Sequence, residues 1–255
     1  HARAAFARAA ELPGLSVEGV AVHIGSQLTE LEPFRAAFTR VVELYRELES
    51  GGAPLKRLDF GGGLGIRYRD ETPIDLAAYA GVVRDLTANL DAELIFEPGR
   101  LLVGNAGVLV TRVIYVKDGA ARRFAVVDAA MNDLIRPVLY DAWHEITPVE
   151  APAPEAGTAP VDIVGPICET ADTLARQRPL PPVEAGDLLA IHSVGAYSAV
   201  MASTYNCRLP APEVLVHGQD YAIVRPRPDH EALIAEDRMP AWLEPPRSNA
   251  SRGAA

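Results

Sequence analysis

The chain is short of the features that mark secreted, membrane-spanning and nucleic-acid-binding proteins. Its 255 residues include two cysteines, Cys168 and Cys207, which are too few for a disulfide framework and predict a reducing, cytoplasmic setting. No apolar run approaches the roughly 20 residues that a membrane helix needs. Acidic residues outnumber basic ones by 34 to 24, and the net charge of −10 argues against nucleic-acid or anionic-membrane partners. A local positive pocket for a small anion stays compatible with this balance, and no metal site is expected.

The chain does contain enough apolar sequence for a packed core. Apolar residues make up 49% and charged residues 23% of it, so general disorder is not expected. The length allows one large domain or two ordinary ones. The apolar pattern changes after residue 100, which predicts two regions of different architecture.

The first region alternates strand-like and helix-like segments. Residues 2–12 predict a helix, and strands are predicted at residues 17–24, 55–60 and 93–96. Helical patterns lie between these strands, and their core-facing residues are predicted to be Phe34, Phe38, Val41, Tyr45 and Leu48 in one and Leu76, Tyr79, Val83 and Leu86 in the other. Strands that alternate with helices in this way predict right-handed βαβ units and a parallel sheet.

The second region is strand-like. Residues 108–116 and 123–128 flank Lys117-Asp118-Gly119, which indicates a hairpin turn. Further strands are predicted at residues 161–164, 188–191, 213–216 and 221–224. Residues 148–160 are expected to form an exposed loop, residues 226–243 a short helix, and the last dozen residues a frayed end.

Each predicted strand of the first region ends in residues suited to chemistry. The three runs are His23-Ile24-Gly25-Ser26, Gly61-Gly62-Gly63 and Glu97-Pro98-Gly99-Arg100. Glycines let backbone N–H groups close on an anion, and Ser26 and Arg100 add donors. The ring of His23 could lie on a planar cofactor, and Glu97 could hold a heteroaromatic nitrogen in its protonated form. The ordinary interpretations are turn glycines, a core histidine, and a helix cap or ion pair.

The second region carries further function-capable side chains. Arg136 and Tyr140 could together bind a carboxylate, or belong to an ordinary surface loop. Cys168, beside Glu169, follows a strand and a Gly-Pro turn, so its thiol could be an acid or a nucleophile, or buried filler. Tyr197 follows another predicted strand and could donate to a phosphate or substrate. The remaining candidates are interpreted as structural: Cys207, His144, His192 and His217.

Taken in order, these motifs resemble diaminopimelate decarboxylase, a pyridoxal-phosphate enzyme family with an alanine-racemase-like barrel and a C-terminal β domain. The resemblance runs from about residue 17 to residue 243. It rests on HIGSQ (23–27), GGGLGI (61–66), EPGR (97–100), MNDLIRPVLYDAWH (131–144), GPICETAD (165–172) and GAYSAVMASTYNCRLPAPEVLV (195–216).

The resemblance implies an α/β plus β fold. Residues 1–104 would be the last part of a (β/α)8 barrel, with about three of its strands, and residues 105–255 the C-terminal β domain with a short terminal helix. We therefore expect the chain to be the C-terminal part of a longer protein. The lysine that forms the Schiff base with the cofactor lies on an early barrel strand in this family, and neither Lys56 nor Lys117 fits it. The chain alone is thus expected to be inactive.

The resemblance also assigns roles. For the cofactor, pyridoxal 5′-phosphate, the implied contacts are His23, Ser26, Gly61, Gly62, Gly63, Glu97, Pro98, Gly99, Arg100 and Tyr197. For the substrate they are Arg100, Arg136, Tyr140, Glu169 and Tyr197. Catalysis falls to His23, which stacks on the pyridoxal ring, to Glu97, which pairs with the pyridine nitrogen, and to Cys168, the proton donor.

The implied substrate follows from Glu169. Relatives that act on ornithine or similar diamino acids typically have an aspartate after the cysteine. The longer acid, with Arg136 and Tyr140, suits a substrate end that bears both an amine and a carboxylate. The resemblance thus implies decarboxylation of meso-2,6-diaminopimelate to L-lysine in a cytoplasmic homodimer, where Cys168 and Glu169 reach the neighbouring subunit's site.

Three alternatives stay open. The first is another diamino-acid or polyamine-precursor decarboxylase of the same fold. The second is a barrel enzyme that binds a sugar phosphate without pyridoxal, which leaves Glu97 and His23 without a task. The third is a non-catalytic pyridoxal-phosphate-binding relative.

Overall fold

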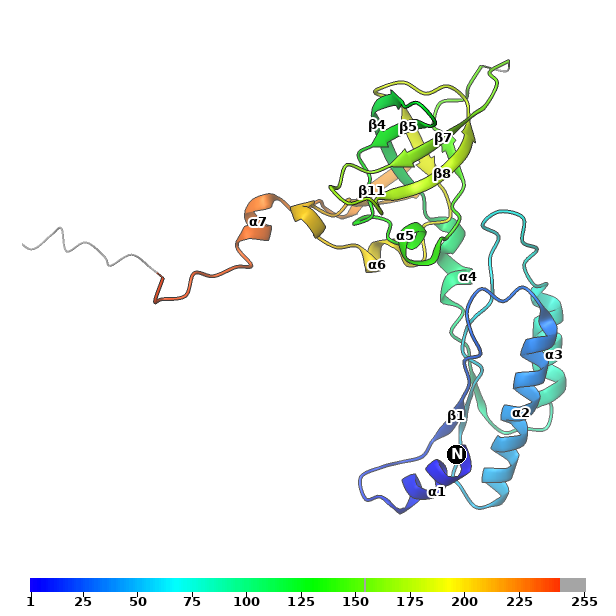
Figure 1. Ribbon diagram of the computed structural model, residues 1–255. Coiled ribbons are helices and arrows are strands. Elements are labelled where there is room, and N and C mark those ends of the chain that lie inside the picture. The colour runs from blue at the N-terminus through cyan, green and yellow to red at the C-terminus, as the bar shows by residue number, and fades with distance from the viewer. Residues whose placement is uncertain (154, 244–255) are drawn as a thin grey trace, which may run out of the picture. The chain divides into compact units, whose positions relative to one another are not determined.

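The computed structural model describes residues 1–153 and 155–243 (Figure 1). The chain divides into two compact units, His1–Met201 and Ala202–Ala255. In the described part of the chain, no helix is long and apolar enough to cross a membrane.

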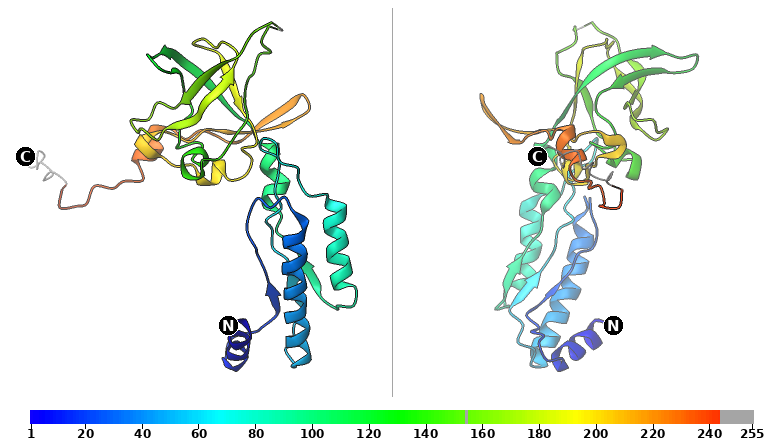
Figure 2. Two further views of the ribbon diagram at one scale, coloured as in Figure 1. Left: turned by 45° about the vertical axis from the view of Figure 1, so that its right-hand side comes forward. Right: turned by 90° about the vertical axis from the view of Figure 1, so that its left-hand side faces the viewer.

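The first unit opens with helix α1 (Ala2–Glu11) and a small parallel sheet. Strands β1 (Gly19–Ala21), β2 (Arg57–Asp59) and β3 (Glu93–Ile95) lie in that order, with Val20, Leu58 and Leu94 in register. Helices α2 (Leu31–Ser50) and α3 (Leu76–Thr87) lie side by side along one face of this sheet (Figures 1 and 2). The predicted βαβ order and parallel sheet are confirmed, although each strand is shorter than predicted.

Aromatic side chains fill the core between this sheet and its helices. Phe34, Phe38 and Tyr45 of α2 are fully buried, and Phe38 packs on Phe60 with ring centroids 4.4 Å apart. The prediction that Leu76 faces the core is wrong, because it is 51% exposed. It is the first residue of α3, directly after Asp75, whose carboxylate caps the helix by accepting from the N–H groups of residues 77 and 78. The buried face of α3 instead consists of Tyr79, Val82 and Val83.

A six-stranded sheet forms the rest of the first unit. Its order is β6-β9-β4-β5-β7-β8, with bounds Ile146–Pro148 (β6), Leu188–Ile191 (β9), Leu109–Asp118 (β4), Arg123–Val127 (β5), Ala159–Val164 (β7) and Thr173–Leu180 (β8). β4 and β5 form the predicted antiparallel hairpin, whereas β5 and β7 pair in parallel. The predicted turn is shifted, because Lys117 pairs with Phe124 inside the ladder and the Gly119 N–H closes the turn on the Arg122 carbonyl.

Strands β6 and β8 were not predicted, because their sequences lack a clear apolar alternation. β6 is three residues long and ends in a proline, and β8 carries two arginines, a glutamine and a proline. They pair with strands that were predicted, β6 with β9 and β8 with β7. Pairing with a neighbouring strand thus stabilises the extended conformation of β6 and β8, which their own sequences favour only weakly.

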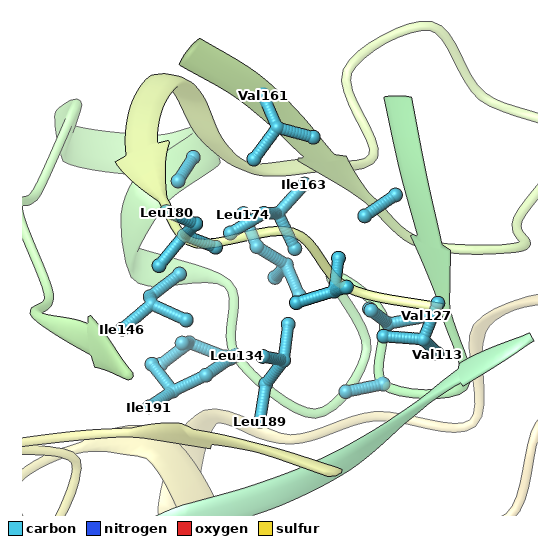
Figure 3. Packing of buried hydrophobic residues seen from close by; sticks show 14 of the residues in the cluster. Val113, Val127, Leu134, Ile146, Val161, Ile163, Leu174, Leu180, Leu189 and Ile191 are labelled. Atoms are coloured by element: carbon cyan, nitrogen blue, oxygen red, sulfur yellow. The ribbon is translucent and has the colours of Figure 1, made fainter. Parts of the chain in front are cut away.

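The core of this sheet is aliphatic, as Figure 3 shows. Val127, Ile163, Leu189 and Ile191 are completely buried, and Leu134, from the loop after β5, packs among them. The described residues between β6 and β7 are mostly exposed, which confirms the predicted loop.

Short helices complete both units. In the first unit these are α4 (Gly99–Val103), η1 (Gly104–Ala106), α5 (Arg136–Tyr140) and α6 (Ser198–Met201). The second unit contains η2 (Tyr205–Cys207), the hairpin of β10 (Glu213–His217) and β11 (Asp220–Arg225), and α7 (His230–Ile234). The strands predicted at residues 213–216 and 221–224 and a short helix within residues 226–243 are confirmed there. The predicted frayed end, the last dozen residues, lies outside the described residues.

Candidate active site

The three predicted strand-end runs meet at one edge of the parallel sheet. The backbone ladder continues past the strands, because Val22 donates to Asp59, Phe60 to Ile95 and Glu97 to Gly61, at 2.8 to 3.0 Å. Since all three strands run the same way, the residues that follow them lie together at this edge.

The glycines are needed because these backbones approach closely. A Cβ on Gly61, which has a φ of 64°, would lie 2.3 Å from the Val22 carbonyl oxygen. One on Gly62 would lie 2.2 Å from the Glu97 carbonyl oxygen, and one on Gly63 (φ 98°) would lie 2.3 Å from that of Gly25. Only glycine fits at these three positions, so the triple glycine sits at a packed junction rather than in an open turn.

Exposed polar side chains surround this glycine junction. The Gly62 N–H donates to Nδ1 of His23 at 3.3 Å, which places the proton of a neutral imidazole on Nε2. His23, Ser26 and Glu97 are all exposed. Among the described residues, no hydrogen bond or ion pair engages the hydroxyl of Ser26 or the carboxylate of Glu97. The edge therefore presents an imidazole, a hydroxyl and a carboxylate that are available to a ligand.

Gln27, which the sequence did not single out, fixes the segment after the glycines. Its amide donates to the Ile66 carbonyl at 2.6 Å and accepts from the Ile66 N–H at 3.1 Å. This pair of bonds holds the backbone two residues before Tyr68. Gln27 thereby helps to place Tyr68 in the cluster described next.

Three of the predicted residues come together around Tyr68, which sequence reasoning missed. The guanidinium of Arg100 donates to the Tyr68 hydroxyl and lies 5.0 Å from the centre of the Tyr197 ring. The guanidinium of Arg136 lies 4.9 Å from the centre of the Tyr68 ring. Tyr68 is 8% exposed, and its position after the glycine run was the only signal that could have found it.

His144 is the second residue of this cluster that sequence reasoning left aside. It is 1% exposed, and its ring nitrogens contact Arg136 Nη1 at 3.0 Å and the His192 carbonyl at 2.9 Å. Burial is the main reason that the pKa of His144 is lowered to about 4, and the nearby guanidinium groups of Arg136, Arg178 and Arg100 contribute to the same shift. These three arginines form a local concentration of positive charge in a chain whose net charge is −10. The sequence left room for such a positive pocket.

Tyr197 is held in a rare backbone conformation close to Arg100. Its φ of 123° lies in a region that non-glycine residues seldom adopt. Just before it, the Gly195 N–H donates to the Gly104 carbonyl at 3.0 Å, and a Cβ on Gly195 would lie 1.8 Å from the Val103 carbonyl oxygen. This close approach anchors the strained turn against the segment that carries Arg100.

The remaining predicted residues are not drawn into the cluster. Arg136 is 7% exposed but Tyr140, at the other end of α5, is 62% exposed. Cys168 and Glu169 are both exposed, and the Glu169 carboxylate accepts from the Ala171 N–H of its own loop. Within the described residues, no hydrogen bond or ion pair connects these three side chains to Arg136.

A buried acid ties the loop of Cys168 to the loop before Arg136. The carboxylate of Asp172 is 3% exposed and accepts from the backbone N–H groups of Met131 at 2.7 Å and Ile167 at 2.8 Å. Asp172 is thus a structural acid, which leaves Glu169 as the exposed acid beside the thiol.

This combination of a glycine-lined sheet edge and a mostly antiparallel six-stranded sheet matches a known class. The model of the pyridoxal-dependent decarboxylase, C-terminal sheet domain, matches residues 21–195. The chain belongs to this family.

Individual relatives define the similarity more narrowly. The diaminopimelate decarboxylase of Zymomonas mobilis subsp. mobilis is 47% identical over 244 residues, which cover 95% of this chain and 57% of that protein. The structure of diaminopimelate decarboxylase from Helicobacter pylori complexed with L-lysine is 39% identical, with a TM-score of 0.85, and the match covers 92% of this chain and 58% of that one. SrLDC in complex with PLP and cadaverine is 27% identical, with a TM-score of 0.72 over 88% of this chain and 56% of that one. The chain therefore spans little more than half the length of these relatives.

Proposed function

We propose that the protein to which this chain belongs decarboxylates meso-2,6-diaminopimelate to L-lysine and CO2, with pyridoxal 5′-phosphate as its cofactor. The similarity to diaminopimelate decarboxylases, one of them complexed with L-lysine, supports this activity. The observation that carries it is the pair of exposed side chains, His23 and Glu97, which follow the two strands on either side of the glycine junction.

The strand ends fit the proposed cofactor. At Gly61 and Gly62 the backbone lies so close to the carbonyls of Val22 and Glu97 that no Cβ could enter, so no side chain from these two positions stands between the imidazole of His23 and the carboxylate of Glu97. Ser26 and the backbone N–H groups of Arg100 and Leu101, in the first turn of α4, offer donors to a phosphate, whereas the Gly99 N–H donates to the Glu97 carbonyl. We assign His23 to stack on the pyridoxal ring, and Ser26, Gly61–Gly63, Pro98, Gly99, Arg100 and Tyr197 to hold the remainder of the cofactor.

The chain's own residues would supply two tasks in the reaction. When bound, pyridoxal phosphate accepts the electron pair that CO2 leaves at the substrate's α-carbon. Glu97 would keep a proton on the pyridine nitrogen, because its exposed carboxylate has no partner among the described residues and is free to pair with it. Cys168 would then donate a proton to the α-carbon, consistent with its exposed position.

The far end of the substrate would meet Arg136, Arg100 and Tyr140, with Glu169 on the distal amine. A buried guanidinium can grip a carboxylate through two parallel hydrogen bonds. Because Cys168 and Glu169 are exposed, they suit residues that serve the site of a second copy, and we propose a homodimer with shared sites.

We further propose that residues 1–104 are the last three strands and helices of a (β/α)8 barrel and that residues 105–255 are the C-terminal β domain. The parallel order of β1–β3 with α2 and α3 on one face supports this assignment. Lys56 directly precedes β2 and Lys117 lies within β4, so neither is at a strand end where the cofactor's lysine is expected. We therefore propose that this chain alone is inactive. We also propose that the whole protein works in the cytoplasm.

The test is product analysis with the full-length protein, offered meso-2,6-diaminopimelate, L-ornithine and L-lysine in turn. We expect L-lysine and CO2 from the first substrate. Glu97→Gln should lower kcat by about 100-fold or more, because the pyridine nitrogen loses its charged partner. Arg136→Met should chiefly raise KM and keep the cofactor's absorbance.

The matched control is Glu93→Gln, an exposed acid at the start of β3, the strand that leads to Glu97. It should change kcat less than twofold. Preference for L-ornithine or L-lysine would favour another decarboxylase of this fold. Loss of cofactor in Arg136→Met would show that the role of Arg136 is assigned wrongly.

A further inference from the structure

His144 is buried with both ring nitrogens engaged, and its two partners fix its tautomer. Nδ1 lies 2.9 Å from the carbonyl oxygen of His192, which can only accept a hydrogen bond. Nε2 lies 3.0 Å from Nη1 of Arg136, and a guanidinium can only donate. The proton must therefore be on Nδ1, and the lone pair of Nε2 must face Arg136.

The surroundings of this imidazole keep it in the neutral form. It is 1% exposed, and the cations that face it are Arg136, Arg100 and Arg178. Burial, with a smaller contribution from these cations, lowers its pKa to about 4, so the Nε2 lone pair stays available to Arg136 across the range in which enzymes ordinarily work. A protonated imidazole would instead set two cations against each other.

The guanidinium of Arg136 is fixed by a hydrogen bond and by an aromatic ring. His144 accepts from Nη1, and the Tyr68 ring lies 4.9 Å from the guanidinium carbon. Tyr68 also meets His144 edge-on, at 5.5 Å between ring centres. Within the described residues, the bond to His144 is the only side-chain hydrogen bond that the Arg136 guanidinium makes. Most of its N–H donors are therefore left for a ligand.

We infer that His144 is a positioning residue for Arg136, holding its guanidinium so that the remaining N–H donors can grip the distal carboxylate of the substrate. This inference rests on the proposed function. It assigns a specific task to a histidine whose sequence context suggested only a structural role. His144 acts through Arg136 and does not itself touch the substrate.

The experiment compares ligands with and without a carboxylate in the full-length protein. L-Lysine carries the carboxylate that Arg136 would bind, whereas cadaverine carries none. In calorimetric titrations, His144→Phe should weaken L-lysine binding on the order of tenfold and leave cadaverine binding within about twofold. In kinetics with meso-2,6-diaminopimelate, the same variant should raise KM by a similar factor and change kcat less than threefold. Arg136→Met should show the same pattern.

Two variants make the result specific. His144→Gln keeps an acceptor oxygen near the Nε2 position and should restore most of the L-lysine affinity. His192→Gln removes a neighbouring imidazole that bonds Thr147 but keeps the backbone carbonyl that anchors His144, so it should behave like the wild type. Equal weakening of L-lysine and cadaverine by His144→Phe would overturn the inference, because it would indicate general damage.

A spectroscopic measurement keeps the inference testable even where His144→Phe fails to fold. Nitrogen-15 NMR of the wild-type imidazoles should show His144 neutral, with its proton on Nδ1, at pH 7. A proton on Nε2, or a charged ring, would overturn the inference. A wild-type protein that releases no CO2 from meso-2,6-diaminopimelate would contradict the proposed function, while the tautomer would still decide how His144 meets Arg136.

Discussion

At the edge of the parallel sheet, backbone groups make the contacts and the side chains of His23, Ser26 and Glu97 stay exposed. Around Arg136 the arrangement is reversed, because side chains make the contacts and are themselves buried. The sheet edge therefore offers its functional groups directly, whereas the cluster around Arg136 holds one functional group in place through contacts with several other side chains.

This difference predicts how each region responds to change. The sheet edge depends on glycines that cannot accept a side chain, so substitutions there disturb the backbone itself. The arginine cluster depends on matched donors, acceptors and rings, so single-atom changes there have graded effects.

Gly62→Ala should have the largest effect on stability. The new Cβ would lie 2.2 Å from the Glu97 carbonyl oxygen, so two adjoining strand ends must separate. We expect the free energy of unfolding to fall by about 3 kcal/mol, the upper part of the range for overpacked interiors. Urea unfolding followed by far-UV circular dichroism measures this loss.

The control is Gly81→Ala, within α3, where a Cβ would meet nothing within 4 Å. That change should stabilise the protein by up to about 1 kcal/mol, because alanine favours helix. If Gly62→Ala were as harmless as Gly81→Ala, the close approach at the glycine junction would be disproved.

The sequence predicted the fold best where the apolar spacing within one segment determines its secondary structure. Apolar spacing located α2, and its Phe34, Phe38 and Tyr45 are buried as predicted. Prediction failed where a neighbouring strand determines the structure. The charged sequence of β8 forms a strand because it pairs with β7. The exposure of Leu76 depends on where α3 begins, and apolar spacing fixes helix boundaries poorly.

The same contrast applies to the candidate site. The residues at the sheet edge follow short apolar strands, so a strand-end pattern was sufficient to single out His23 and Glu97. Tyr68 and His144 lie in segments without such a pattern, and their importance comes from contacts with Arg100 and Arg136 that only the folded chain creates. Sequence reasoning found the groups that could meet a ligand and missed those that hold them.

Protonation of His144 should give the next largest effect. Its pKa is about 4 in the folded protein and about 6.5 in the unfolded chain, so the unfolded state binds more protons between these values. Stability from this residue is therefore complete above pH 6.5 and is lost as the pH falls toward 4. Between pH 7.5 and 4.5 the loss should be about 2 kcal/mol.

The measurement is the free energy of unfolding as a function of pH, for the wild type and for His144→Gln. The variant lacks the titrating group, so its curve should fall about 2 kcal/mol less over the same range. Parallel curves for the wild type and His144→Gln would show that the imidazole is not held neutral.

Tyr68→Phe should give the smallest effect and separate the two things that this residue does. It removes the hydroxyl that accepts from Arg100 and keeps the ring beneath Arg136. We expect a loss of about 1 kcal/mol in the free energy of unfolding, the usual net value of one hydrogen bond.

Tyr115→Phe, a comparable change at a residue that is 49% exposed, should cost close to nothing. Because the ring and His144 still hold Arg136, L-lysine affinity should change much less in Tyr68→Phe than in His144→Phe. Equal losses of affinity would mean that the cluster acts as one unit rather than through its separate contacts.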